Sequence, residues 1–329
     1  MKRSPRTDFR QETHNIQYSS RAIDGYKSKI VDPGAPKDYG YLAHKNRFPS
    51  IAKVIKEWNP DICNLQEIQN PNPTDGIDEV TQYSDFFGEA YDSRSFHFKP
   101  SKRRPNQYLM TANRKSLTRV IACASYHLDQ WVSEGRTGTI SHSKIEVKRP
   151  DREIGEIVHV FNTHFHPEQV GGMNTAKVMP HILENCIGED YKQERITISG
   201  DFNTFLQSGG PEQVRIIKEG CGMQDAVDAA TFISTNDYGQ KGELATHTFY
   251  LFIYDEEALR VTHPECFDES GGFLQMPIDH VFYRNLRGIK AFVDNRTIGQ
   301  LGGSKDPRLN NVTPADHFPV VVDFALTDY

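Results

Sequence analysis

The chain has 329 residues, of which 37% are hydrophobic and 25% charged, and its net charge is −6. No apolar run reaches the roughly 20 residues that a membrane-spanning helix needs, so no membrane span is expected. Proteins that bind long nucleic acid over their whole surface are usually basic, and the acidic balance disfavours that class. A site that cleaves phosphate esters stays open, because bound cations can supply local positive charge.

The cysteines favour a reduced protein of the cytoplasm. Their number, five, is odd, and no pair has the spacing typical of a zinc site. The basic residues 1–5 are followed by no apolar stretch, so no secretory signal is expected there. Secretion is the alternative if a signal peptide has been removed.

Hydrophobic periodicity and turn residues predict the helices and strands. The apolar residues Ile51, Val54 and Trp58 follow helical spacing, and Asn59-Pro60 ends that helix. In chain order, we expect a helix at residues 46–58, strands at 61–68 and 157–161, a helix at 174–186, a strand at 195–199, a helix at 211–218, and strands at 278–283 and 318–326.

These elements indicate a fold class. Strands outnumber helices, and most connections are too short for repeated β–α–β crossovers. The sequence therefore predicts an α/β (α+β) fold built as a four-layer sandwich, with two packed, mostly antiparallel β-sheets flanked by helices. No linker divides the chain, which indicates a single domain over residues 1–329.

Polar side chains follow several of the predicted strands. Asp201 and Asn203 alternate around Phe202 just after a strand, so both can point the same way. Glu67 closes another strand, where a buried carboxylate would need a cation or a donor. Magnesium prefers such carboxylate ligands. The alternatives are an Asx turn at Asp201 and an exposed strand end at Glu67.

Two histidines and an aspartate occupy similar positions. His164 ends one strand, and His317 precedes another. Histidines on separate strands suit a general base and a donor to developing phosphate charge. Asp279 enters an apolar strand and needs a partner, which a histidine ring nitrogen would supply. The alternative partner is a nearby arginine, Arg284.

The order of these clusters is characteristic. The sequence resembles the endonuclease/exonuclease/phosphatase superfamily, whose members have the deoxyribonuclease-I-like fold. The matching segments span almost the whole chain and are Thr13-His14-Asn15-Ile16, Leu65-Gln66-Glu67, Asn162-Thr163-His164-Phe165, Ser199-Gly200-Asp201-Phe202-Asn203, Ile278-Asp279-His280-Val281 and Ala315-Asp316-His317-Phe318-Pro319-Val320.

The resemblance implies roles for the metal-binding and phosphate-binding residues. Asn15 and Glu67, with Asp316 as a further ligand, would hold Mg²⁺, and Mn²⁺ is the alternative cation. Asp201 and Asn203 would contact the scissile phosphate and the attacking water.

The resemblance also implies three catalytic roles. His317 would act as a base or a phosphate clamp, oriented by Asp279. His164 would stabilise the transition state or assist the leaving group.

The sequence departs from the secreted deoxyribonuclease branch at one informative place. There a glutamate precedes a Gln-Tyr-Leu run, whereas here the residue is Asn106. Asn106 and the nearby Tyr108 are candidate substrate-binding residues, and a core position is the alternative for Tyr108. Residues 250–272 resemble an insertion, either a lid over the site or a surface loop.

These features predict a metal-dependent hydrolase that cleaves a phosphodiester by in-line attack of activated water, with nucleic acid as one substrate. The basic residues 102–104, Arg114, Lys115 and Arg119 could grip a phosphate backbone, or form a solvated loop. Alternatives are a phosphatase or phosphodiesterase for sugar, inositol or lipid-linked phosphates, and a non-catalytic binding module of the same fold. The sequence indicates no protein partner.

Overall fold

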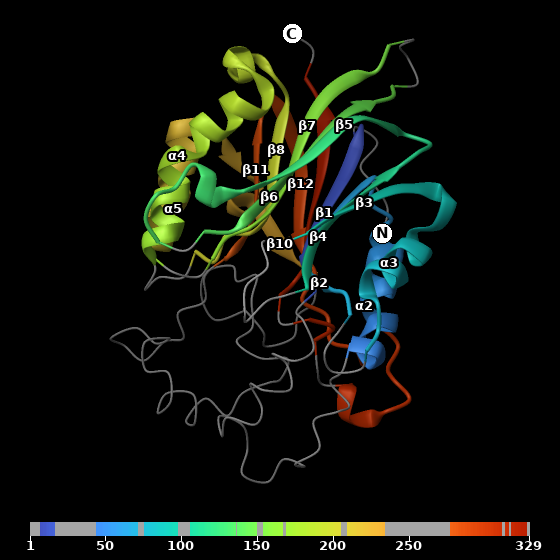
Figure 1. Ribbon diagram of the computed structural model, residues 1–329. Coiled ribbons are helices and arrows are strands. Elements are labelled where there is room, and N and C mark those ends of the chain that lie inside the picture. Colours follow the sequence, from blue (N-terminus) through green and yellow to red (C-terminus); the bar gives the residue numbers. More distant parts are fainter. Residues whose placement is uncertain are drawn as a thin grey trace.

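Two β-sheets packed face to face form the centre of the protein, with helices on their outer faces (Figure 1). The computed structural model describes residues 7–16, 44–71, 76–97, 106–135, 137–149, 154–166, 169–204, 209–233, 277–310, 313–315 and 317–327. This architecture confirms the predicted four-layer sandwich.

One sheet contains seven strands. Its pairs are antiparallel except for β1–β2 and β10–β12, which are parallel. In spatial order the strands are β10 (Ala230–Phe232), β12 (Leu286–Val293), β13 (Val320–Leu326), β1 (Phe9–Asn15), β2 (Ile62–Gln69), β4 (Gln107–Arg114) and β3 (Tyr91–His97).

The other sheet contains six strands. Only its β7–β8 pair is parallel, so the prediction of mostly antiparallel sheets is confirmed. In spatial order the strands are β5 (Thr118–His127), β6 (Thr139–Val147), β7 (Glu156–His164), β8 (Ile196–Asp201), β11 (Asp279–Arg284) and β9 (Gln224–Asp225).

Two pairs of helices cover the outer faces of the sheets (Figure 1). On the seven-stranded sheet, α2 (His44–Trp58) and α3 (Glu79–Phe87) pack with Leu65 and Met110 in one apolar cluster. On the six-stranded sheet, α4 (Gln169–Ile187) and α5 (Gly210–Cys221) pack with Phe161 and Ile198. Short 3₁₀ helices are η2 (Gly88–Ala90), η3 (Leu128–Gln130), η4 (Glu189–Gln193), η6 (Ala226–Ala229) and η8 (Pro307–Leu309).

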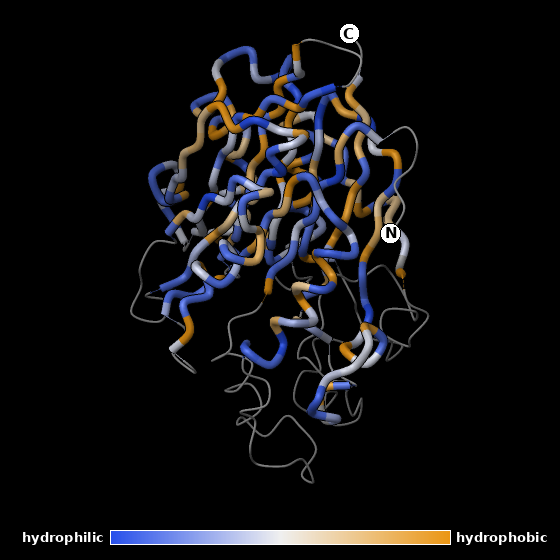
Figure 2. Tube along the Cα trace, turned by 90° about the vertical axis from the view of Figure 1, so that its right-hand side faces the viewer, coloured by the Kyte–Doolittle hydropathy of each residue, from blue (hydrophilic) through white to orange (hydrophobic). Residues whose placement is uncertain are grey.

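All eight elements expected from the sequence are present, with shifted ends. The largest shift is in α4, which begins five residues earlier than the expected residue 174 and carries Pro180 inside it. The strands β3 to β6 and β12 and the helix α3 were not predicted, because their apolar residues do not form clear periodic runs. The strands β9 and β10 were not predicted because they are only two and three residues long. Hydrophobic and hydrophilic segments are interspersed along the chain (Figure 2).

The space between the sheets is apolar at one end. Phe9, Val160, Val281 and Phe324 meet there in a fully buried cluster. Burial of such side chains stabilises the sandwich by roughly 1.5–3 kcal/mol each. None of the described helices is long and apolar enough to cross a membrane.

The outer face of β1 carries charged groups beneath α2. Arg10 is buried and pairs with Asp323, with 2.6 Å between its Nε and Oδ1. Glu12 is also fully buried, and neither of its carboxyl oxygens has a hydrogen-bond partner in the described part of the chain. Burial raises the pKa of Glu12 from 4.5 to about 8; the Asp294 carboxylate adds to the rise, and Arg10 opposes it.

A raised carboxyl pKa makes stability depend on pH in a defined direction. The folded protein holds the Glu12 proton more tightly than the unfolded chain, so stability from this group is lost as pH rises from about 4.5 to about 8. We expect Glu12→Gln to remove this loss, because glutamine does not ionise. The free energy of unfolding of the variant, relative to wild type, should rise by up to about 1.4 kcal/mol per pH unit across that window.

Urea unfolding at pH 5 and pH 8.5 measures this difference. The exposed Glu89→Gln variant is the matched control and should follow the wild-type pH dependence. A constant difference between Glu12→Gln and wild type over this range would contradict a buried, protonated Glu12.

Candidate active site

The predicted site residues gather at one edge of the sandwich. The parallel pairs β1–β2 and β7–β8 bring Asn15, Glu67, His164 and Asp201 to the same edge, because each residue lies at or near the carboxyl end of its strand. The antiparallel strand β11 starts there with Asp279, which lies opposite Asp201 in the register. Asp201 therefore has His164 on one side and Asp279 on the other.

Glu67 reaches the site through a β-bulge. The pairing of β2 with β4 shifts register between Leu65 and Ile68, and Glu67 has a φ of 62°. A bulge bends the strand and re-aims a side chain, and a left-handed conformation is uncommon for a glutamate. The Glu67 side chain is 2% exposed and points toward His164. The strand β2 ends at Gln69, one residue later than expected, and the irregular backbone at Glu67 directs its carboxylate into the site.

The turn after β8 has a similar departure from regular backbone. Asn203 has a φ of 49°, and its backbone N–H donates to Asp201 Oδ1 over 2.8 Å. Its side-chain amide donates to the carbonyl of Phe165 over 2.8 Å. Phe202 is fully buried and packs against Phe165 and Phe282. The turn does contain an Asx-type contact, and the same contact orients the Asp201 carboxylate.

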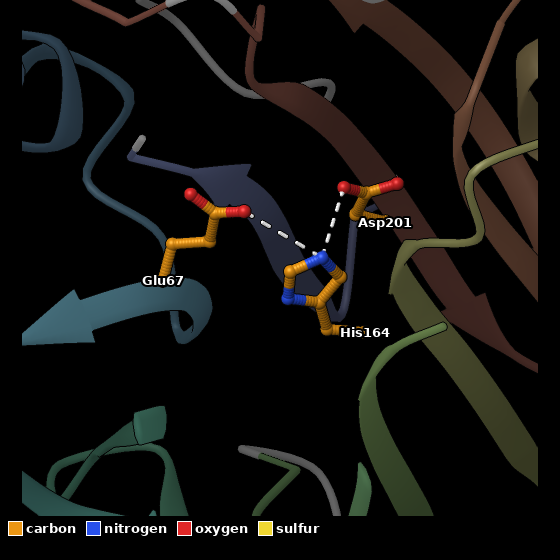
Figure 3. Close-up of side chains that lie close together, drawn as sticks. All are labelled: Glu67, His164 and Asp201. Carbon is orange, nitrogen blue, oxygen red and sulfur yellow. Dashed lines mark ion pairs between the residues drawn. The ribbon is translucent and has the colours of Figure 1, made fainter. Parts of the chain in front are cut away.

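A buried group of Glu67, His164 and Asp201 forms the first half of the site (Figure 3). His164 Nε2 lies 3.6 Å from Glu67 Oε1 and 3.4 Å from Asp201 Oδ2. One potential ligand atom from each side chain lies within 4.8 Å of the others, which is close enough for a shared ion.

The second half of the site is built around the other side of Asp201. Asn15 Nδ2 donates to Asp201 Oδ2 over 2.9 Å and lies 3.3 Å from His317 Nε2. His317 Nδ1 is 2.8 Å from Asp279 Oδ2, so an Nδ1–H donated to this carboxylate orients the ring. His317 Nε2 then faces Asp201, at 3.8 Å from Oδ2. The sequence-based pairing of Asp279 with a histidine agrees with this geometry.

The site concentrates negative charge in a buried place. Burial raises the pKa of Asp201 from 3.8 to about 7; His317 opposes the rise, and Asp279 and Glu67 reinforce it. Buried carboxylates that repel one another are stabilised when a cation binds between them. Carboxylate and amide oxygens are also the donors that Mg²⁺ prefers, so Glu67, Asp201 and Asn15 fit a hard divalent cation.

Two glycines allow the strands to approach behind the site. A Cβ on Gly200 would lie 1.9 Å from the carbonyl oxygen of Thr163, and one on Gly138 would lie 1.8 Å from that of His164. A side chain at Gly200 would push β7 away from β8, and one at Gly138 would displace the end of β7 from the side of β6. Gly200 lies in one of the matching segments, whereas Gly138 was missed because nothing in its local sequence marks it.

Below the carboxylates, buried amides connect the two sheets. Gln66 Nε2 donates to Asn162 Oδ1 over 2.7 Å, and Asn162 Nδ2 donates to the carbonyls of Leu65 and Met110. Gln66 and Asn162 precede the site residues in two of the matching segments, and that position was the only available signal of their structural role.

The two candidate substrate-binding residues lie at the start of β4, and Tyr108 packs against the apolar cluster under α2 and α3, as in the core alternative. The Tyr108 ring contacts the His97 ring edge-on at 4.7 Å between centroids, and the Asn106 carbonyl accepts the N–H of Asn70. The hydrogen bonds and ring contacts described for these two residues do not involve the carboxylate–histidine cluster. Asp316 and residues 250–272 lie outside the described residues.

The basic stretch does not gather at the site where the structure describes it. Arg114 pairs with Asp61, at the end of β4 farthest from Glu67, and Arg119 pairs with Glu146. Arg114 ends β4 and Arg119 lies in β5, so these two arginines belong to strands rather than to the solvated loop of the alternative, and both are ion-paired away from the site. Residues 102–104 lie outside the described part of the chain.

Comparison with protein-family models and with curated protein sequences finds no match. Comparison with solved structures finds similar folds over almost the whole chain. An endonuclease/exonuclease/phosphatase from Bacteroides vulgatus is 17% identical with a TM-score of 0.62, covering 97% of this chain and 99% of that one. A mannosyl-6-phosphatase from Bacteroides thetaiotaomicron is 16% identical with a TM-score of 0.63, covering 97% and 100%.

The human Nocturnin catalytic domain is 14% identical with a TM-score of 0.60, and the match covers 97% of this chain and 93% of that one. Identities this low establish the fold and leave the chemistry to the site residues. The chain thus has the deoxyribonuclease-I-like fold of the endonuclease/exonuclease/phosphatase proteins, as its ordered motifs predicted.

Proposed function

We propose that the protein is a divalent-metal-dependent phosphoester hydrolase, with a phosphodiester as the leading substrate. The observation that carries this proposal is the position of Asp201, which is buried between His164 and the Asp279-oriented His317. The two halves of the site converge on one carboxylate, as expected for a centre that activates water beside a phosphorus atom.

The metal would be held mainly by Glu67 and Asn15, with Asp316 as a further ligand and Mg²⁺ or Mn²⁺ as the ion. Mutual repulsion among the buried carboxylates supports the fit. A bound cation supplies polarisation of the phosphate and neutralisation of the charge on the leaving oxygen.

The chain's own residues would perform the proton transfers and orient the reactants. Asp201 and Asn203 would position the attacking water and the scissile phosphate. Either Asp201 accepts the proton of the water while His317, held by Asp279, clamps a phosphate oxygen, or His317 is the base that accepts this proton. His164 would donate to the developing charge or to the leaving oxygen.

Phosphomonoesters of sugars or inositol, and lipid-linked phosphates, form the second class of substrate. The similar structures include a mannosyl-6-phosphatase, which supports keeping sugar phosphates in the tests. The two described arginines of the basic stretch, Arg114 and Arg119, are ion-paired away from Glu67 and do not favour a long nucleic acid. A catalytically silent binding module of the same fold is the competing class.

The described thiols are consistent with the proposed cytoplasmic location. Cys63, Cys123, Cys186 and Cys221 are all free, and disulfides are typical of oxidising compartments. Secretion remains the alternative location.

Dependence on a metal distinguishes an enzyme from a binding module. We expect the protein to turn over at least one substrate with Mg²⁺ or Mn²⁺. EDTA should abolish this turnover and added metal should restore it, because a cation is needed to offset the repulsion between the carboxylates and the anionic phosphate. The panel is plasmid DNA, single-stranded DNA, RNA, inositol phosphates, mannose 6-phosphate, sphingomyelin and a bis-aryl phosphodiester. Metal-independent turnover, or none on the whole panel, would contradict the proposal.

Two substitutions test the assignment of residues. Glu67→Gln and His317→Ala should each lower kcat by roughly 10²–10⁴ while the fold persists, because each removes a charge or a proton carrier at the reacting atoms. The exposed Glu89→Gln and His181→Ala variants are matched controls and should keep wild-type turnover. Circular dichroism and thermal unfolding check the fold, and near-normal turnover in either site variant would refute its assigned role.

A further inference from the structure

Another buried histidine lies behind the site. His280, the residue after Asp279, is 2% exposed and points to the opposite side of the strand β11 from the carboxylate cluster. Its Nδ1 is 2.6 Å from Asp225 Oδ2, and its Nε2 is 2.9 Å from the hydroxyl of Thr204 and 3.1 Å from the carbonyl of Pro277.

The partners of this ring hold it from both sides. Asp225 Oδ2 accepts a hydrogen bond from Nδ1, and Nε2 lies beside the Thr204 hydroxyl and the Pro277 carbonyl. The Thr204 hydroxyl donates to the Pro277 carbonyl over 2.9 Å and can accept from His280. The other oxygen of Asp225 accepts the backbone N–H of Val227. The result is a buried imidazole–carboxylate pair whose ring nitrogens and carboxylate oxygens all have hydrogen-bond partners.

This pair joins two segments that carry the site. Thr204 directly follows Asn203 in the turn that presents Asp201, and Pro277 lies two residues before Asp279. The Phe202 ring lies edge-on to His280, with 5.7 Å between centroids. A displacement of His280 or Asp225 would therefore move both the turn and the start of β11.

Thr204 does not act as a nucleophile in this arrangement. Its side chain is fully buried, and its hydroxyl hydrogen is donated to a backbone carbonyl. A Thr–His–Asp order resembles a catalytic triad, but the oxygen has no path to a substrate. Polar side chains are costly to bury compared with apolar ones, so a role beyond packing is favoured here.

We propose that Asp225, His280 and Thr204 form a clamp of positioning residues that holds the Asp201–Asn203 turn against the start of β11 in its catalytic geometry. The kinetic part of this inference rests on the proposed phosphoesterase function. The clamp acts from behind the turn and contacts no substrate. Its effect is expected on kcat, because small displacements of reacting groups slow the chemical step more than they weaken binding.

Thr204→Val and Asp225→Asn remove one link each at nearly constant volume. We expect kcat on the responsive substrate to fall by about ten-fold or more, with KM changed by less than about two-fold. Thr204→Ser keeps the hydroxyl and should restore most of the turnover. Thr118→Val is the matched control, because Thr118 is buried and donates to a backbone carbonyl at the far end of the sandwich.

Amide hydrogen exchange supplies a readout that does not need turnover. The N–H groups of Phe202 and Asn203 donate to Ile278 O and Asp201 Oδ1 and report the turn directly. Their exchange should accelerate by at least about ten-fold in Thr204→Val and Asp225→Asn, and should stay at the wild-type rate in Thr204→Ser and Thr118→Val.

Turnover and amide exchange together distinguish a failure of the proposed function from a failure of the clamp. If wild type cleaves nothing on the panel, the proposed function fails, and the exchange rates alone decide the clamp. Unchanged kcat together with unchanged exchange in folded Thr204→Val and Asp225→Asn would overturn the clamp. A fall in kcat that Thr204→Ser does not rescue, or that Thr118→Val reproduces, would also overturn it in favour of a general loss of stability.

Discussion

The geometry of the site depends on a buried polar layer between the two sheets. Gln66 of one sheet donates to Asn162 of the other, and Asn162 donates back to the carbonyls of Leu65 and Met110. Farther along, the hydroxyl of Ser199 accepts from Gln11 and Asn64. Buried amides tolerate few arrangements, because each unpaired polar atom costs about 1–3 kcal/mol.

An apolar interface could slide with little penalty, whereas these hydrogen bonds lock one sheet against the other. The ends of β1 and β2 therefore meet the ends of β7 and β8 at a defined distance. That distance brings Asn15 within 2.9 Å of Asp201 and Glu67 within 3.6 Å of His164. The polar layer thus fixes the relative position of the two sheets, and with it the contacts between the site residues.

Strain and charge repulsion are concentrated above this layer. Glu67 and Asn203 both have positive φ values, and Asp201 is buried near two other carboxyl groups. Such features lower stability and persist only where the surrounding fold holds them. They occur together at the convergence of strand ends, which agrees with a centre that a cation and a phosphate would complete.

The local pattern of apolar and polar residues was enough to predict much of the fold and the chemical nature of the site. Apolar runs with turn residues indicated β2, β7, β8, β11 and β13, because strand periodicity is a property of neighbouring residues. Polar residues at the ends of those runs indicated Glu67, His164 and Asp201. The ordered motifs indicated the fold, and they paired Asp279 with His317, because the order of strand-end residues follows the topology.

Only the tertiary structure could decide the rest, because contacts between residues distant in the sequence have no local signature. The bulge at Glu67 depends on the pairing of β2 with β4, and the close approach at Gly138 depends on the carbonyl of His164. The link from Asp225 through His280 to Thr204 joins residues up to 76 positions apart. The sequence by itself determined which chemical groups are present and at which strand ends; the packing of two sheets decided which of them meet.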